Sequence, residues 1–160
     1  MAFVDKDANG KRLFNVTAKV GKYQTNDKDD VTIVKALLNV ISLDPQIVPN
    51  LKYPFPDPDV PTMTDAEDHT ILDYQRTKNK TNKSKFLAED GVVSPMRNSS
   101  GIWHEGAGGH NSYWTIYVMN GSARRIVKEM LGWPEDHLDY ICRRWPKIGE
   151  RYLPLLEATE

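Results

Sequence analysis

Residues 30–41, DVTIVKALLNVI, form the stretch that decides the fold. Its apolar side chains recur at the spacing of one helix face: Ile33, Val34, Leu37, Leu38 and Ile41. Asp29 or Asp30 is expected to cap this helix, because either carboxylate places negative charge at the positive end of the helix dipole. We therefore predict a helix here with one buried face.

The segments on either side of this helix have different compositions. Before it, an Asn9-Gly10 turn precedes strand-forming residues 13–20, so the first thirty residues predict a short hairpin. After it, six of the ten prolines lie between Pro45 and Pro61. Because proline fixes φ and lacks an N–H donor, we expect an ordered, extended excursion rather than a helix or a central strand.

A second helix is predicted to begin at a capping box, in which Thr64 and Glu67 satisfy each other's backbone N–H groups. It leads into residues 76–85, which hold five basic and no acidic side chains. We interpret this basic stretch as a solvated loop. Contact with an acidic partner or an anionic wall polymer is the lesser alternative.

The last sixty residues predict one strand and two helices. Residues 113–119 (YWTIYVM) are aromatic and β-branched, which favours a strand. Ser122 is expected to cap a third helix after it. Pro134 is expected to start a fourth helix, which Pro146 ends.

Three segments carry a resemblance that extends over about residues 20–100: Gly21-x4-Asn26-x3-Asp30-Val31-x2-Val34-x2-Leu37-Leu38-Asn39, Thr70-Ile71-x2-Tyr74-Gln75-Arg76, and Glu89-Asp90-Gly91-Val92-Val93-Ser94-Pro95. In this order they resemble the peptidoglycan-binding-like domain family. The resemblance implies a small three-helix bundle that recognises cell-wall glycopeptide. It assigns a structural role, rather than ligand contacts, to Leu37, Leu38, Asn39, Tyr74, Gln75, Asp90, Gly91 and Pro95.

The chain departs from this family pattern at several points. Lys35 and Ala36 stand where the family often carries Gln, and residues 99–101 interrupt the expected third helix. Pro95 would otherwise set the first turn of that helix. The connection between Pro45 and Pro61 is also longer than usual.

The expected fold class is mainly α with short β elements. The peptidoglycan-binding-like helical bundle would be elaborated by an N-terminal hairpin, a C-terminal strand and a helix pair. We predict a single compact domain over residues 1–160, with the bundle at 20–100 and a layer of strand plus helices at 101–160.

Composition excludes several classes of protein. The chain has 21 Lys and Arg against 22 Asp and Glu, so it lacks the basic excess of a dedicated nucleic-acid binder. Its one cysteine excludes an internal disulfide framework and a Cys-cluster zinc site. No membrane insertion is expected. The charged start without an apolar run predicts a cytoplasmic protein, or export by a non-classical route.

Candidate ligand-binding residues flank a glycine-rich loop at residues 106–109. Trp103, Tyr113 and Trp114 offer aromatic faces on which sugar rings stack, and Asn111 can bond hydroxyl groups. In the alternative interpretation, Trp114 belongs to a buried strand and Trp103 only anchors the loop.

The same loop offers a candidate metal site. Two imidazoles and a carboxylate, His104, Glu105 and His110, lie within seven residues and can hold zinc. The spacing differs from the helical H-E-x-x-H pattern, and the glycines favour a surface loop.

The favoured hypothesis is a non-catalytic binding module for cell-wall glycan or peptide, without a cofactor. One alternative is a metal-dependent cell-wall hydrolase or amidase. The other is a structural or adaptor component of a secretion or phage-like particle. The expected partner is the glycan or peptide, or another protein, and the oligomeric state stays open.

Overall fold

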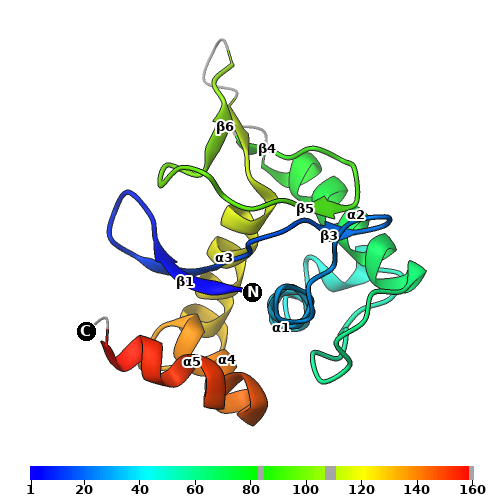
Figure 1. Cartoon of the computed structure of the whole chain (residues 1–160). Coiled ribbons are helices and arrows are strands. Elements are labelled where there is room, and N and C mark those ends of the chain that lie inside the picture. The colour runs from blue at the N-terminus through cyan, green and yellow to red at the C-terminus, as the bar shows by residue number, and fades with distance from the viewer. Residues whose placement is uncertain (83–84, 107–110, 159–160) are drawn as a thin grey trace.

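A computed structural model describes residues 1–82, 85–106 and 111–158. About 47% of these residues lie in helices, and the strands are short. Figure 1 shows one helix near the centre of the molecule, with the other helices and the small sheets around it. The expectation of a mainly α chain with short β elements is confirmed at this level.

The central helix is α1 (Lys28–Ile41). Its N-cap is Asp27, whose carboxylate accepts hydrogen bonds from the backbone N–H groups of Asp29 and Asp30. The prediction that Asp29 or Asp30 caps the helix is therefore wrong. Asp30 is fully buried instead, and its carboxylate accepts hydrogen bonds from Thr17 and Ala18, which fixes the segment before the helix.

Helix α1 is buried on more than one face. It packs against α2 (Asp65–Thr81), α3 (Thr115–Arg125) and the π-helical turn η3 (Ile126–Met130). Ten of its fourteen residues are buried, including Lys35. The single apolar face expected from the sequence is therefore too narrow, because neighbours surround this helix.

The proline-rich segment forms neither an α-helix nor a strand, as predicted, but it is less extended than expected, since turns and bends accompany the short 3-10 turn η1 (Val48–Asn50). It is attached to α1 by side-chain hydrogen bonds. Lys35 Nζ donates to the carbonyl of Val60 at 2.6 Å, and Asn39 Nδ2 donates to the carbonyl of Pro56 at 3.0 Å. Because α1 supplies these partners, the segment has a defined path without regular secondary structure.

The capping box at the start of α2 is confirmed. Glu67 accepts from the Thr64 N–H at 3.0 Å, and Thr64 Oγ1 accepts from the Ala66 N–H. Glu67 also forms an ion pair with Lys35 at 3.2 Å. The same carboxylate therefore links the start of α2 to the buried helix α1.

The N-terminal hairpin is confirmed. Strands β1 (Phe3–Lys6) and β2 (Arg12–Asn15) pair antiparallel, and Phe3 lies opposite Asn15. Gly10 has φ +76° in the turn between them. The second strand ends earlier than residue 20, since Val20 begins a separate strand, β3 (Val20–Gly21), which pairs antiparallel with β5 (Val92–Val93).

The predicted strand at residues 113–119 is wrong. Only β7 (Asn111–Tyr113) is extended, and α3 begins at Thr115. Tertiary contacts override the β-propensity of these residues, because Ile116, Met119 and Ala123 are fully buried on one face of α3. Ser122 therefore lies inside α3 rather than at its N-cap.

Two helices follow, α4 (His137–Arg144) and α5 (Pro146–Ala158), and they pack against each other. The fourth helix begins at His137, capped by Asp136, rather than at Pro134. Pro146 ends α4, as predicted, but it also occupies the first position of α5, a helix that the sequence pattern does not predict. Figure 1 shows this pair on one side of the molecule, away from β6 (Ile102–His104).

In the described ranges, the buried apolar side chains form one continuous core that includes residues of the hairpin, the helices and the segment around Met96. No helix in these ranges combines the length and the apolar character needed to cross a membrane.

Candidate functional site

The candidate site is a shallow cleft of about 210 Å³ beside the turn at Asp90, here called the aromatic cleft. Three of the four predicted ligand-binding residues line it together. Its lining includes Asp90, Ser94, Trp103, Tyr113, Trp114 and Thr115.

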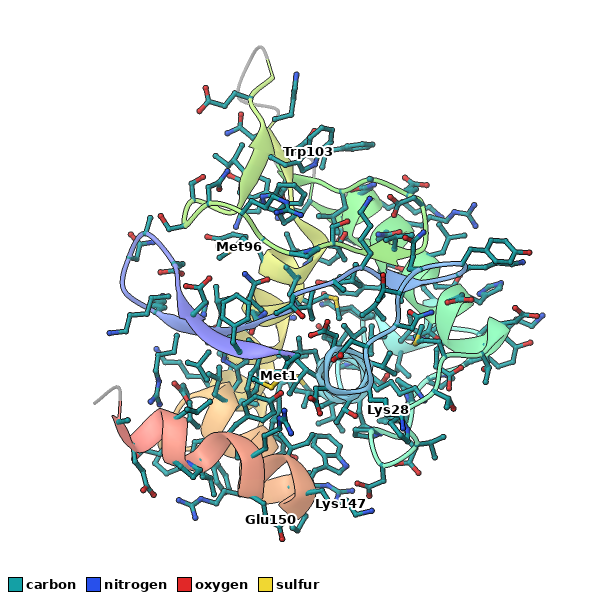
Figure 2. The ribbon with its side chains drawn as sticks, in the orientation of Figure 1. Met1, Lys28, Met96, Trp103, Lys147 and Glu150 are labelled. Atoms are coloured by element: carbon teal, nitrogen blue, oxygen red, sulfur yellow. The ribbon has the colours of Figure 1, made fainter. Side chains whose placement is uncertain are left out.

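A three-stranded sheet positions the aromatic residues. Strand β7 pairs in parallel with β4 (Lys85–Phe86) and antiparallel with β6. Trp103 lies on β6, and Tyr113 ends β7 opposite Ile102. Figure 2 shows Trp103 on the hairpin that projects from the body of the molecule.

The two indole rings lie close together. The ring centroids of Trp103 and Trp114 are 6.4 Å apart, at an interplanar angle of 48°. Trp103 is 47% exposed, whereas Trp114 is partly buried at the start of α3. Trp103 therefore presents an accessible aromatic surface, with Trp114 behind it as a second wall.

Glycine at position 101 brings the hairpin close to α3. Gly101 has φ +77°, and a Cβ atom there would lie 2.3 Å from the ring of Tyr117. Any other residue would therefore push β6 away from α3. The sequence pattern gave no signal of this role.

The polar wall of the cleft is fixed by Gln75. Its Nε2 donates to Asp90 Oδ1, the Val92 carbonyl and Thr115 Oγ1 at 3.0–3.2 Å. Its Oε1 accepts from the N–H groups of Asp90 and Gly91. One buried amide thus joins α2, the turn and the start of α3.

A second amide holds the opposite side of the turn. Asn26 Oδ1 accepts from the Gly21 N–H at 2.8 Å, and Asn26 Nδ2 donates to the Gly21 carbonyl at 2.9 Å. A Cβ atom on Gly21 would lie 2.6 Å from the carbonyl oxygen of Gly91. The first and third segments of the resemblance therefore meet at this point.

The other residues to which the resemblance assigns a structural role lie in the core or near it. Leu37, Leu38 and Tyr74 are fully buried, and the Tyr74 hydroxyl lies 2.8 Å from Ser122 Oγ. Burial raises the pKa of Tyr74 well above its usual range. Pro95 is buried but leads into a loop rather than a helix, because none of the residues 96–106 is helical.

Asn15 fixes the backbone just after Pro95. Its side chain accepts from the Met96 N–H at 2.9 Å and donates to the Met96 carbonyl at 2.9 Å. These bonds occupy the backbone groups that a helix would otherwise use, and they hold the loop against β2.

The polar atoms around the cleft differ from those expected. Asn111 is half-buried on β7 and pairs with Lys85, but it is not among the lining residues. Asp90 and Ser94 line the cleft instead. Both belong to the segment at 89–95, whose sequence pattern was assigned a structural role only.

Trp114 contributes a further polar group. Its Nε1–H is buried and has no hydrogen-bond partner among the described residues. A buried donor without a partner is costly, so this N–H is an unsatisfied group in the wall beside the cleft.

The residues of the metal hypothesis lie on the same hairpin. His104 and Glu105 are exposed, and the ring of His104 lies 5.6 Å from that of Trp103. His110 lies outside the described residues. Within the described ranges, no three His, Cys, Asp or Glu side chains gather in a way that could hold a metal ion.

The chain was compared with protein-family models, with curated proteins and with solved structures, and none of the three comparisons gives a match.

Proposed function

We propose that this protein is a non-catalytic binding module for cell-wall glycan or peptide. The observation that carries the proposal is the pairing of an exposed Trp103 with Trp114 and Tyr113 around one cleft. Ligand sites combine apolar and aromatic walls with a few polar groups that fix orientation. Here Asp90, Ser94 and Thr115 supply those polar groups.

The size of the cleft limits the ligand. Pockets for drug-sized molecules usually measure about 300–1,000 Å³. A cleft of about 210 Å³ therefore suits one sugar ring or the end of a short peptide. The ring would stack on Trp103, while its hydroxyl groups or the peptide amides bond Asp90 and Ser94.

The proposal includes a peptidoglycan-binding-like bundle built from α1, α2 and α3. Support comes from the contacts of Gln75, which join the second and third segments of the resemblance, and from the contact of Gly21 with Gly91, which joins the first and third. In this assignment, residues 97–113 are an insertion before the third helix. That insertion carries Trp103 and so builds the cleft.

Sedimentation with purified peptidoglycan sacculi tests the proposal. We expect the wild-type protein to sediment and Trp103→Ala to remain in the supernatant. Tyr23→Ala is the matched control, because Tyr23 is an aromatic residue that is 92% exposed and does not line the cleft. A wild-type protein that stays in the supernatant, or equal sedimentation of Trp103→Ala, would contradict the proposal.

Metal removal separates this proposal from the hydrolase alternative. A module that binds through aromatic stacking and hydrogen bonds is expected to sediment equally with and without EDTA. Release of soluble muropeptides from the sacculi, abolished by EDTA, would instead favour zinc chemistry at His104, Glu105 and His110.

A further inference from the structure

A second pocket, of about 280 Å³, lies between the β1–β2 turn, the end of α2 and the outer face of α3. Five basic side chains line it, here called the cationic pocket: Lys11, Lys78, Lys85, Arg124 and Arg125. They come from four separate elements or turns. The fold, rather than one local run of sequence, therefore brings these charges together.

Few negative charges offset these cations. Asp7 is the one acidic residue in the lining, and its Oδ1 already accepts from the N–H groups of Asn9 and Lys11. Arg125 forms an ion pair with Asp44 outside the pocket. Among the described residues, no ion pair involves Lys11, Lys78 or Lys85.

Lys78 is half-buried beside these positive charges. Burial lowers its pKa, and the neighbouring positive charges of Arg125 and Lys85 lower it further, while Asp44 opposes them. Lys85 Nζ lies over the rings of Tyr113 and Tyr117, 5.4 and 5.8 Å from their centroids. These contacts hold the ammonium group of Lys85 without neutralising it.

The wall of the pocket contains a glycine inside a helix. Gly121 lies within α3, where alanine would be the more stabilising residue. A Cβ atom at this position would have no atom within 4 Å, so packing does not require glycine. The absent side chain leaves room beside Arg124 and Arg125.

We propose that the cationic pocket binds a compact anion with two or more negative charges, such as a phosphate group or a pair of carboxylates. The small volume of the pocket and the overall net charge of -1 favour such a ligand over a long polyanion, which needs an extended basic track. The lysines supply the charge. One Nη of Arg124 already donates to the Arg12 carbonyl and one Nη of Arg125 pairs with Asp44, so the remaining N–H groups of the two guanidinium groups are the donors for the oxygens of either ligand group.

Isothermal titration calorimetry with inorganic pyrophosphate and, separately, with citrate tests this site. We expect saturable binding of at least one of them with a stoichiometry of one, which weakens as NaCl rises. Pyrophosphate alone would indicate a phosphate ligand, and citrate alone a carboxylate ligand. Absence of binding by both anions at low salt would overturn the proposal.

Two substitutions locate the site. Lys78→Gln should weaken binding at least tenfold, whereas Lys80→Gln, an exposed lysine of the same helix outside the pocket, should leave it within twofold. Gly121→Glu places a carboxylate against the pocket and should abolish binding, while Gly121→Ala controls for the change in helix propensity. Equal losses in Lys78→Gln and Lys80→Gln would show unspecific attraction and overturn the proposal.

Anion binding at the cationic pocket is expected to be independent of the aromatic cleft. Trp103→Ala should bind pyrophosphate or citrate as the wild-type protein does, because Trp103 does not line the cationic pocket. A failure of sacculus binding and a failure of anion binding are therefore separate outcomes.

Discussion

At the scale of single residues, a few buried amides connect segments that are distant in the chain. Gln75 bonds the turn at Asp90 and the start of α3, and Asn120 bonds both the N–H and the carbonyl of Phe14. These side chains replace the backbone ladders that larger sheets would provide. Their removal should therefore cost more than the loss of an average polar contact.

Gln75→Leu tests this role directly. The substitution leaves the N–H groups of Asp90 and Gly91 without their acceptor, so we expect a loss of about 3 kcal/mol in the free energy of unfolding. Urea denaturation measures the loss. Gln46→Leu, at an exposed position, is the control and should change stability by less than about 0.5 kcal/mol. Similar values for the two variants would refute the role of Gln75.

His137 gives the fold a dependence on pH. Its Nε2 lies 2.8 Å from Asn120 Oδ1, which is an acceptor, so the neutral ring carries its proton on Nε2. Burial, with Arg124 and Arg12 nearby, lowers the pKa of His137 well below its usual value. The unfolded chain therefore binds a proton at His137 at a higher pH than the folded chain does.

The direction in which stability changes with pH follows from this difference in proton binding. The contribution of His137 to stability is complete above about pH 6.5 and declines as the pH falls below that value. Between pH 7.5 and 5.5 we expect wild-type protein to lose about 1 kcal/mol more than His137→Gln, measured by urea unfolding at both pH values. Parallel pH profiles for the two proteins would contradict the prediction.

At the scale of elements, the proline-rich segment depends on α1. Lys35 is 1% exposed, and it pairs with Glu67 while it donates to Val60. Lys35→Met should cost about 3 kcal/mol, because Glu67 then loses its buried cation. Hydrogen exchange at the Phe55 N–H, which donates to Ser42 Oγ, should also become faster.

Lys28→Met, an exposed position in the same helix, is the control for that substitution. It should leave both the stability and the exchange of Phe55 near the wild-type values. Unchanged exchange at Phe55 in Lys35→Met would show that the segment holds its path without Lys35.

The elements that could be predicted from the sequence are those set by local chemistry. The capping box at Thr64 and the turn at Gly10 need only neighbouring residues, and both were predicted. Helix α3 was mistaken for a strand because its β-branched and aromatic residues become helical only through packing against α1 and β2. Helix α5 was missed because Pro146 and Pro154 are typical helix breakers, yet both lie within it.

The candidate site could also be predicted only in part from the sequence. Aromatic residues beside a polar loop indicated Trp103, Tyr113 and Trp114, and these do line one cleft. The polar wall was not identified, because Asp90 and Ser94 belong to the segment at 89–95, whose sequence pattern indicated only a structural role. The cationic pocket was indicated only in part. Lys78 and Lys85 belong to the basic stretch 76–85, but its interpretation as a solvated loop is wrong, because α2 extends to Thr81 and Lys78 is half-buried. Lys11 and Arg124 join them only in the folded chain.

At the scale of the whole molecule, the two proposed sites are neighbours. The rings of Tyr113, in the aromatic cleft, and Tyr117, in the cationic pocket, stack with centroids 5.8 Å apart. Lys85 lies over both rings. A ligand that carries both a sugar ring and an anionic group would therefore meet complementary surfaces on the same side of the protein.

Nuclear magnetic resonance of the tryptophan side chains tests the central proposal most directly. The chain has four tryptophans, and Trp133 and Trp145 lie outside the aromatic cleft. When a soluble muropeptide is added to ¹⁵N-labelled protein, the indole N–H signals of Trp103 and Trp114 should shift in a saturable way, while those of Trp133 and Trp145 stay fixed. No shift at any tryptophan, or shifts confined to Trp133 and Trp145, would contradict the assignment of a wall-binding cleft.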